Sequence, residues 1–308
     1  MKTVSVLLST YNGEKYILEQ LESLRIQSRH IDEVLIIDDC STDSTVQVCR
    51  DYISYHQLNQ EWRVFINETN KGWIINFHEG QKMILGDIVF FCDQDDIWKN
   101  DKVQQALDIL DQHEFVDVIA TREDLLYNDG NVVNARDSEG FEFINISKRP
   151  EDFYIRCSGC TMAFRRKFSE SIYDEFTGCW AHDDMMWKIA GANGRMLLCH
   201  KSSILHRIHG NNASRQKRRD KCRRISDIQE YIVNLERYRD YLSRHIECEG
   251  YQEVLSVTEK HLNGNYLRLK FLQSRNILFY IRLATQYRLI YRTTHQLLGD
   301  LVVAYGKK

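Results

Sequence analysis

The N-terminal part of the chain alternates between short apolar runs and longer amphipathic segments. Four apolar runs are expected to form strands: residues 3–9, 33–37, 63–66 and 88–92. After Asn12, an expected helix cap, apolar residues recur at helical spacing, and Trp73 opens a further expected helix that ends near Leu85. Strands that alternate with helices predict βαβ units, and therefore an α/β fold with a mostly parallel sheet.

Polar side chains follow three of the four predicted strands. In a parallel sheet the carboxyl ends of the strands meet at one edge, which is where α/β proteins bind ligands. Tyr11 offers a ring on which a nucleotide base can stack, and Asp39 offers an acceptor for a base N–H. The polar strand ends are Thr10-Tyr11-Asn12, Asp38-Asp39 and Asp93-Gln94-Asp95.

The acids after the fourth strand suit a metal ion. If the chain stays extended through Gln94, the carboxylates of Asp93 and Asp95 project from the same side. A hard divalent ion binds one or two such carboxylates and completes its coordination with water and substrate phosphates. The sequence therefore predicts a site for a diphosphate-bearing substrate.

Composition limits the possible classes of protein. The chain has 308 residues, 43% of them hydrophobic, which is enough for a sizeable core. It contains no apolar run of about 18 residues, and Met1-Lys2 leads directly into a strand pattern, so we expect neither a membrane span nor a signal peptide, but a cytoplasmic protein. The nine scattered cysteines are expected to be reduced, structural thiols.

Charge divides the chain unequally. Residues 201–308 hold 21 Lys and Arg against 10 Asp and Glu, whereas residues 1–200 hold 20 against 34. We expect a catalytic domain over residues 1–213 and a basic helical region over 214–308, in which apolar residues from Ile228 to Leu242 recur at helical spacing. Its apolar but Arg- and Lys-containing segments favour two alternatives equally: the surface of an anionic membrane or a homodimer interface.

Four segments in order resemble the successive signatures of family 2 glycosyltransferases with the GT-A fold, over roughly residues 3–212. They are residues 4–13, 36–45, 70–72 and 93–96. The resemblance implies that Tyr11 and Asp39 hold the base, that Asp93 contacts the ribose and that Asp95 ligates Mn²⁺ or Mg²⁺. Cys40 stands where the family pattern usually has glycine. The nucleotide site implied by the resemblance comprises Thr10, Tyr11, Asp38, Asp39, Lys71, Asp93 and Gln94.

The second half of the chain resembles the acceptor side of the same family. Residues 159–166 look like the strand beneath the acceptor, and residues 180–184 look like the helix start that carries the catalytic base. Asp183 is the preferred base and the adjacent Asp184 is its rival. His209 lies in a segment that resembles the family's loop over the donor phosphates. The resemblance implies that His209 contacts the metal or a phosphate. The implied metal site therefore contains Asp93, Asp95 and His209.

The implied activity is a metal-dependent, inverting transfer of one sugar from a nucleotide diphosphate donor to a glycan or polyprenyl-linked acceptor. Residues 93–98, 180–183 and 209–212 look most like bacterial rhamnosyltransferases of capsule, O-antigen and wall polysaccharide assembly, whereas glucosyl, galactosyl or N-acetylhexosaminyl transfer would use the same residues. The Gln-x-x-Arg-Trp signature of processive synthases is missing, which favours single additions. Two other classes are disfavoured: a sugar-1-phosphate nucleotidyltransferase lacks its Gly-rich loop here, and the basic residues 215–224 are more typical of a solvated helix face than of a nucleic-acid site.

Overall fold

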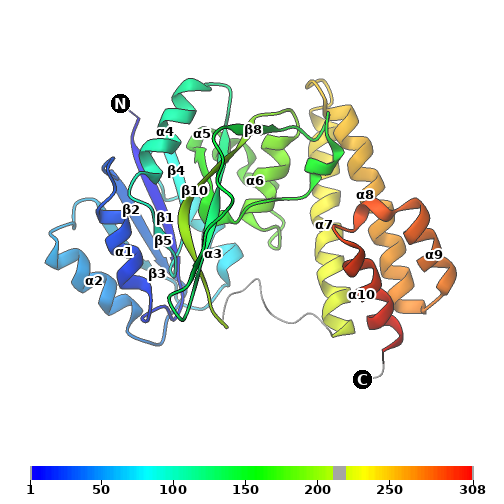
Figure 1. Cartoon of the computed structure of the whole chain (residues 1–308), viewed down its shortest axis with the longest axis horizontal. Coiled ribbons are helices and arrows are strands. Elements are labelled where there is room, and N and C mark those ends of the chain that lie inside the picture. Colours follow the sequence, from blue (N-terminus) through cyan, green and yellow to red (C-terminus); the bar gives the residue numbers. More distant parts are fainter. Residues whose placement is uncertain (1, 211–219, 307–308) are drawn as a thin grey trace. The chain divides into compact units, whose positions relative to one another are not determined.

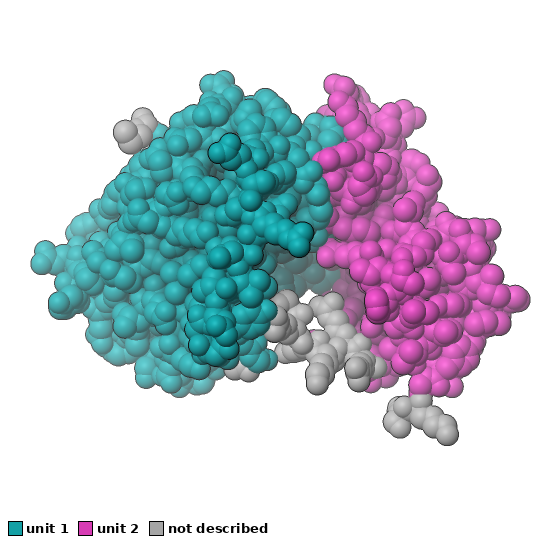
Figure 2. Space-filling model, viewed as in Figure 1, with its two compact units in different colours: residues 1–145, 155–210 teal, residues 146–154, 211–308 magenta. Residues whose placement is uncertain are grey.

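The computed structural model describes residues 2–210 and 220–306. The chain divides into two compact units, coloured separately in Figure 2: unit 1 comprises residues 1–145 and 155–210, and unit 2 comprises residues 146–154 and 211–308. Unit 1 carries the sheet, and unit 2 carries the C-terminal helices (Figure 1). The predicted boundary at residues 213 and 214, and the basic run at 215–219, lie outside the described residues.

Unit 1 is built on a mixed sheet with the strand order β3-β2-β1-β4-β9-β6-β10-β5, in which β7 pairs with β6 and β8 with β10. Its four longest pairings, β1 with β2, β1 with β4, β2 with β3 and β6 with β10, are parallel. The shorter pairings are antiparallel. The predicted α/β fold with a mostly parallel sheet is therefore confirmed. The strands are β1 (Val4–Thr10), β2 (Glu33–Asp38), β3 (Trp62–Ile66), β4 (Ile88–Asp93), β5 (Ile97–Trp98), β6 (Val118–Tyr127), β7 (Val132–Val133), β8 (Phe141–Ile144), β9 (Ala163–Arg165) and β10 (Met196–Ile208).

Helices bury both faces of the parallel half of the sheet. Val4, Val6 and Leu8 of β1 belong to one core with α1 (Ile17–Arg25), α2 (Thr45–Tyr55) and α4 (Lys102–Gln112). On the other face, Leu7 lies against Gly80 of α3 (Trp73–Gln81), where an added Cβ would approach its side chain to 2.6 Å. Because both faces are covered, these strands appear in the sequence as continuous apolar runs.

The start of α1 differs from its prediction. The helix begins at Ile17, after Tyr16 as the N-cap residue, and Asn12 does not cap it. Asn12 instead has a positive φ of 47°, and its side-chain oxygen accepts the backbone N–H of Thr42 at 2.8 Å. Asn12 therefore joins the turn after β1 to the turn after β2, since asparagine tolerates the left-handed region.

The remaining helices of unit 1 follow in the second half of the chain. The face of the sheet that carries α3 also carries α6 (His182–Gly191), because the buried ring of His182 contacts Phe77 of α3 at 4.2 Å and Phe91 of β4 at 4.2 Å between centroids. The other elements are α5 (Arg166–Ile172) and the short 3₁₀ helices η2 (Gly159–Thr161) and η3 (Tyr173–Glu175).

Unit 2 contains two long helices, α7 (Lys221–Arg244) and α8 (Tyr251–Ser274), with α9 (Ile277–Gln286), η5 (Arg288–Ile290) and α10 (Thr294–Tyr305) packed on α8 (Figure 1). Residues 146–154, which include η1 (Pro150–Phe153), belong to this unit: the ring of Phe153 stacks on His261 at 3.9 Å. The predicted helical face of α7 is confirmed by its buried residues Ile228, Ile232, Leu235, Tyr238 and Leu242. Within residues 2–210 and 220–306, every helix is too short or too polar to cross a bilayer.

Candidate active site

The candidate site lies at the carboxyl edge of β1, β2 and β4. β1 lies between the other two strands, and the parallel register pairs Thr10 with Asp38 and Ser9 with Asp93. Adjacent strands lie about 5 Å apart. The three polar strand ends therefore meet at one edge, as the sequence predicted.

Asp38 fixes the turn that follows β2. Its carboxylate accepts the hydroxyl of Thr10 at 2.8 Å, and the backbone N–H and hydroxyl of Ser41 at 2.7 and 2.6 Å. The turn passes through Cys40, which has a φ of 65°. This left-handed conformation favours glycine, which explains why the family pattern usually has glycine here.

Asp39 organises the loop before α3. Its buried carboxylate accepts the side-chain amide of Asn67 at 2.9 Å and the backbone N–H groups of Lys71 and Gly72 at 2.8 and 2.7 Å. The ammonium group of Lys71 forms an ion pair with Glu79 at 2.6 Å. Asp39 and Lys71 therefore lie together at the predicted site, but both side chains already hold protein partners.

Gln94 holds the backbone of Tyr11. Its side-chain oxygen accepts the N–H of Tyr11 at 2.8 Å, and its amide donates to the carbonyl of Tyr11 at 3.0 Å. Gly13 makes room for this contact, because a Cβ there would lie 2.2 Å from the Gln94 oxygen. The ring of Tyr11 stays exposed beside this turn, where it is available for stacking.

The acid-rich turn after β4 brings Asp95 to His209. The chain turns at Gln94 and Asp95, so the expected extended conformation is wrong, and strand alternation does not align Asp93 with Asp95. The Nε2 atom of His209 lies 2.6 Å from a carboxylate oxygen of Asp95. Burial and the charge of Asp96 raise the pKa of Asp95, whereas the hydrogen bond with His209 lowers it. Burial, with the charges of Asp96 and Asp95, also raises the pKa of Asp93.

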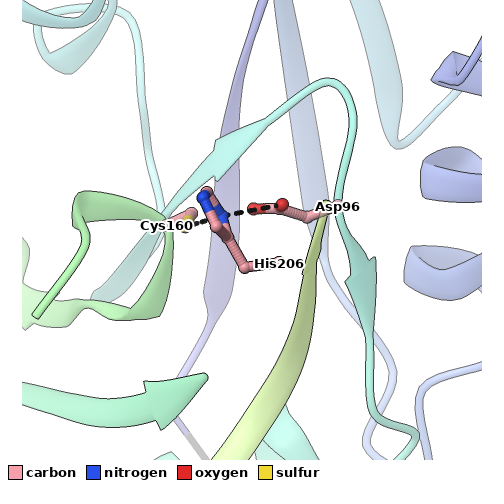
Figure 3. Close-up of side chains that lie close together, drawn as sticks. All are labelled: Asp96, Cys160 and His206. Carbon is pink, nitrogen blue, oxygen red and sulfur yellow. Dashed lines mark hydrogen bonds and ion pairs between the residues drawn. The ribbon is translucent and has the colours of Figure 1, made fainter. Parts of the chain in front are cut away.

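Asp96 points into the protein, where it meets His206 and Cys160 (Figure 3). One carboxylate oxygen of Asp96 lies 3.0 Å from Nδ1 of His206 and accepts the backbone N–H of Arg207 at 3.0 Å. Its other oxygen is buried, with no hydrogen-bond partner among the described residues. The buried ammonium group of Lys102 donates to the carbonyl of Cys160 at 2.6 Å, which adds a positive charge to this cluster.

Two groups of side chains therefore offer metal ligands. In the described chain, donor atoms of Asp96, Cys160 and His206 lie within 4.8 Å of one another. The side chain of Asp96 is 0% exposed, whereas those of Asp95 and His209 are 14% and 11% exposed. A metal that also binds a substrate diphosphate must be reachable from solvent, so Asp95 and His209 fit that role and the buried group does not.

Sequence reasoning missed the residues that fix His209. The ring of Tyr16 stacks on His209, with 5.1 Å between the ring centres. The guanidinium of Arg207 lies 4.8 Å from the centre of the Tyr16 ring. Arg207 also donates to the carbonyl of Asp95 at 2.9 Å and to the carboxylate of Glu19 at 3.0 Å. These side chains come from segments far apart in the sequence, and no local pattern marks them.

The two acids at the start of α6 have different surroundings. Asp184 accepts the indole N–H of Trp180 at 2.9 Å and the ammonium group of Lys188 at 2.5 Å. Among the described residues, the side chain of Asp183 accepts the backbone N–H of Asp184 at 2.8 Å. Burial and the charge of Asp184 raise the pKa of Asp183 to about 6, and its charge in turn acts on Asp93. Among the described residues, Asp184 thus binds an indole and an ammonium group, whereas Asp183 binds one backbone N–H.

The fold and the site define a class of protein. A sheet with this order, an acid-rich turn at the end of β4 and two acids at the start of α6 are features of glycosyltransferases with the GT-A fold. The chain belongs to glycosyl transferase family 2, whose family model matches residues 5–172. The predictions of family, fold and enzyme class are confirmed.

Individual relatives match part of the chain. RfbG of Shigella flexneri, described as a dTDP-rhamnosyl transferase, is 37% identical over 110 residues, which are 33% of this chain and 36% of RfbG. TarS of Staphylococcus aureus, described as a poly(ribitol-phosphate) β-N-acetylglucosaminyltransferase, is 37% identical over 116 residues, which are 37% of this chain and 20% of TarS. The matched segments thus span well under half the length of these relatives.

Solved structures agree with the fold. TarS 1–349 in complex with UDP-GlcNAc has a TM-score of 0.62 at 22% identity, covering 98% of this chain and 90% of that chain. The mannosyltransferase PcManGT from Pyrobaculum calidifontis, in complex with GDP-Man and Mn²⁺, has a TM-score of 0.58 at 18% identity, covering 98% of this chain and 86% of that chain. At such low identity these likenesses show the fold alone.

Proposed function

We propose that the protein is a metal-dependent, inverting glycosyltransferase. It moves one sugar from a nucleotide diphosphate donor to a hydroxyl group of a glycan acceptor, in the biosynthesis of a cell-surface polysaccharide. The observation that carries this proposal is the contact of 2.6 Å between Asp95 and His209 at the carboxyl edge of the sheet. Oxygen and imidazole donors at a partly exposed position suit Mn²⁺, and Mg²⁺ through the carboxylate.

Asp95 and His209 would hold the divalent ion, and with it the diphosphate of the donor. When bound, such an ion stabilises the negative charge that the leaving diphosphate develops. Asp96 and Arg207 keep the segment that carries His209 against the turn that carries Asp95. Asp93 lies at the end of β4 beside them, as a ligand of the ion or an acceptor for the ribose hydroxyls.

The nucleoside is held between the turns after β1 and β2. The exposed ring of Tyr11 stacks on the base, and Gln94 fixes the backbone of Tyr11. Thr10 and Asp38 stabilise the turn beneath it, and Asp39 orients the backbone of Lys71 towards the same crevice. A carboxylate accepts about four hydrogen bonds, so Asp39 retains capacity for a base N–H beside its three protein partners.

Asp183 acts as the general base. An inverting transfer requires a carboxylate on the sugar face opposite the leaving group, to accept the proton of the incoming hydroxyl. The raised pKa of about 6 suits this role, because a base works best when its pKa lies near the working pH. Asp184 holds Lys188 and the indole of Trp180, and so orients the start of α6.

For the donor we favour dTDP-L-rhamnose. RfbG, described as a dTDP-rhamnosyl transferase, supports this choice, but TarS is equally similar over a segment of similar length and is described as an N-acetylglucosaminyltransferase. UDP-glucose, UDP-galactose and UDP-N-acetylhexosamines are therefore the alternatives.

All nine cysteines are free thiols. A reducing compartment favours free thiols, and we therefore infer a cytoplasmic enzyme.

The test is a donor screen with the 308-residue chain. Release of nucleoside diphosphate is measured for dTDP-rhamnose, UDP-glucose, UDP-galactose and the UDP-N-acetylhexosamines, with Mn²⁺, with Mg²⁺ and with a chelator. We expect turnover of one donor, only with a divalent ion, and its loss in Asp95→Ala. The control is Asp108→Ala, on the exposed face of α4, which should keep full activity. Normal turnover in Asp95→Ala, or in the presence of the chelator, contradicts the proposal.

A further inference from the structure

The helix α9 of unit 2 exposes apolar side chains. Leu278 is 67% exposed, and Ile277 and Ile281 on the same side of the helix are also exposed, whereas Leu283 is its fully buried residue. A helix on a water-facing surface normally places polar residues outward. α9 therefore presents the side that a soluble surface helix would bury.

The helix α10 repeats this arrangement. Leu298, Val302 and Tyr305 recur at positions i, i+4 and i+7 and are exposed, with Val302 at 68%. The hydroxyl of Tyr305 donates to the carbonyl of Arg275, two residues before α9, and the ring of Tyr305 lies 6.3 Å from Phe271 of α8. The end of the α10 stripe thus lies beside the start of α9. We call the exposed apolar residues of the two helices the α9–α10 surface: Ile277, Leu278, Ile281, Leu298, Val302 and Tyr305.

The stretch of chain that carries this surface is rich in positive charge. Residues 261–308 contain eight Lys and Arg but a single acid, Asp300. Asp300 is fully buried, and its carboxylate binds Arg268 at 3.0 Å and the hydroxyl of Tyr291 at 3.0 Å. The described part of this stretch therefore exposes no carboxylate. Its exposed cations are Lys270, Arg275, Arg282 and Arg292.

A cavity lies between α8 and α9 at the edge of the surface. It measures about 380 Å³, and Lys270 and Arg282 contribute its cations. Tyr266 and Tyr287 line it as well, and the hydroxyl of Tyr266 donates to Glu236 of α7. Two cations beside aromatic rings and an aliphatic helix suit a ligand with an anionic head and an apolar body.

We propose that the α9–α10 surface docks on an anionic lipid bilayer. Aliphatic side chains enter the boundary of the acyl chains, and the flanking cations gain from anionic head groups. With 10 and 12 residues, α9 and α10 are about 15–18 Å long, roughly half the thickness of the hydrocarbon layer, so they lie along the interface.

The charge and the aliphatic character of this surface disfavour two other binding partners, a second copy of the chain and nucleic acid. In a two-fold dimer this surface would face its own copy, and its exposed cations would repel one another. Single-stranded nucleic acid stacks on aromatic platforms rather than on leucine, isoleucine and valine. An anionic bilayer satisfies both the cations and the aliphatic residues.

Flotation of the 308-residue chain with vesicles tests this inference, independently of enzymatic activity. One vesicle preparation contains phosphatidylcholine alone, and the other contains phosphatidylcholine mixed with phosphatidylglycerol. We expect binding to the mixed vesicles, little binding to the neutral ones, and weaker binding in high salt because the charges are screened.

Two variants, each with a matched control, separate the apolar contribution to vesicle binding from the electrostatic contribution. Leu278→Asn should weaken binding roughly tenfold or more, because an exposed leucine no longer enters the bilayer. Arg282→Gln should weaken it about fivefold, the effect of one cation near an anionic surface. The matched controls, Leu85→Asn and Arg50→Gln on exposed positions of unit 1, should bind as the wild type does.

Three outcomes overturn the proposal. The first is equal binding, or no binding, to both vesicle types. The second is the same loss of binding in the controls as in the two variants. The third is a stable dimer in sedimentation that Leu278→Asn converts to a monomer while vesicle binding is absent, which assigns the surface to a second copy of the chain.

Discussion

Replacing Asp183 with asparagine removes the proposed base and little else. Asparagine keeps the size of the side chain and an oxygen for the backbone N–H of Asp184, which Asp183 binds at 2.8 Å. It cannot accept a proton from the acceptor hydroxyl. We expect transfer to fall by roughly 10²–10⁴-fold, the usual contribution of a general base, while the dissociation constant of the donor stays unchanged.

The pH dependence of the wild type follows from the pKa of Asp183. Burial and the charge of Asp184 disfavour the ionised form and raise this pKa to about 6. The base acts only when deprotonated, so activity is retained above pH 6 and falls below it. One unit below the pKa, about a tenth of the molecules carry the active form, and kcat/KM should fall about tenfold. Asp183→Asn should lose this acidic limb.

Asp184→Asn is the variant to compare with Asp183→Asn. Lys188 is 1% exposed, and the substitution leaves its ammonium group without the carboxylate at 2.5 Å. We expect a loss of roughly 3–5 kcal/mol in the free energy of unfolding, measured by chemical denaturation. The substitution also removes a charge that raises the pKa of Asp183, so the acidic limb of the folded variant should move to lower pH.

Two results would refute this assignment. The first is transfer at the wild-type rate by Asp183→Asn. The second is the reverse pattern, in which folded Asp184→Asn loses transfer and its acidic limb while Asp183→Asn keeps both. In that case Asp184 is the base, and the contacts of Asp184 with Trp180 and Lys188 must open during the reaction.

Further substitutions test the residues around the donor site. Gly13→Ala should weaken nucleotide binding about tenfold in calorimetry with little change in stability, because the new Cβ displaces the flexible Gln94 from Tyr11. Cys40→Gly should raise the free energy of unfolding in urea by up to about 1 kcal/mol, since it relieves a positive φ of 65°; a loss of stability would contradict this. Asp96→Asn should raise the Mn²⁺ concentration for half-maximal activity by roughly 10–100-fold with nucleotide binding retained, because the segment before His209 loosens; an equal loss of both would indicate general damage.

The sequence predicted the parallel strands well because their burial leaves a simple pattern. Helices cover both faces of β1, β2 and β4, so these strands are continuous apolar runs, and parallel pairing then brings their polar ends to one edge. It predicted the helices of unit 2 for a similar reason, because α7 buries one face at helical spacing. The antiparallel strands β5, β7 and β8 are two to four residues long, too short for any periodicity to mark them.

The finer contacts of the site depend on packing over long sequence distances. His209 and Asp95 are 114 residues apart and meet because β10 runs beside β6 and β5 towards the edge where Asp95 lies. The turn at Gln94 is a local departure from extended backbone that the adjacent apolar run does not signal. The contact of Gln94 with Tyr11 follows from that turn. For this reason the sequence identified Gln94 as a site residue but did not predict its contact with Tyr11.

Adjacent acids in this site have different surroundings, and buried cations make the difference. Asp96 turns inward to His206, and Asp184 turns to Lys188. Each pairing uses one carboxylate to position an element and leaves its neighbour, Asp95 or Asp183, at the accessible side. Burial and the charge of the positioned carboxylate together raise the pKa of the neighbour. In each of these two pairs, the buried cation therefore marks the carboxylate that positions an element, and its neighbour is the one that we propose takes part in the reaction.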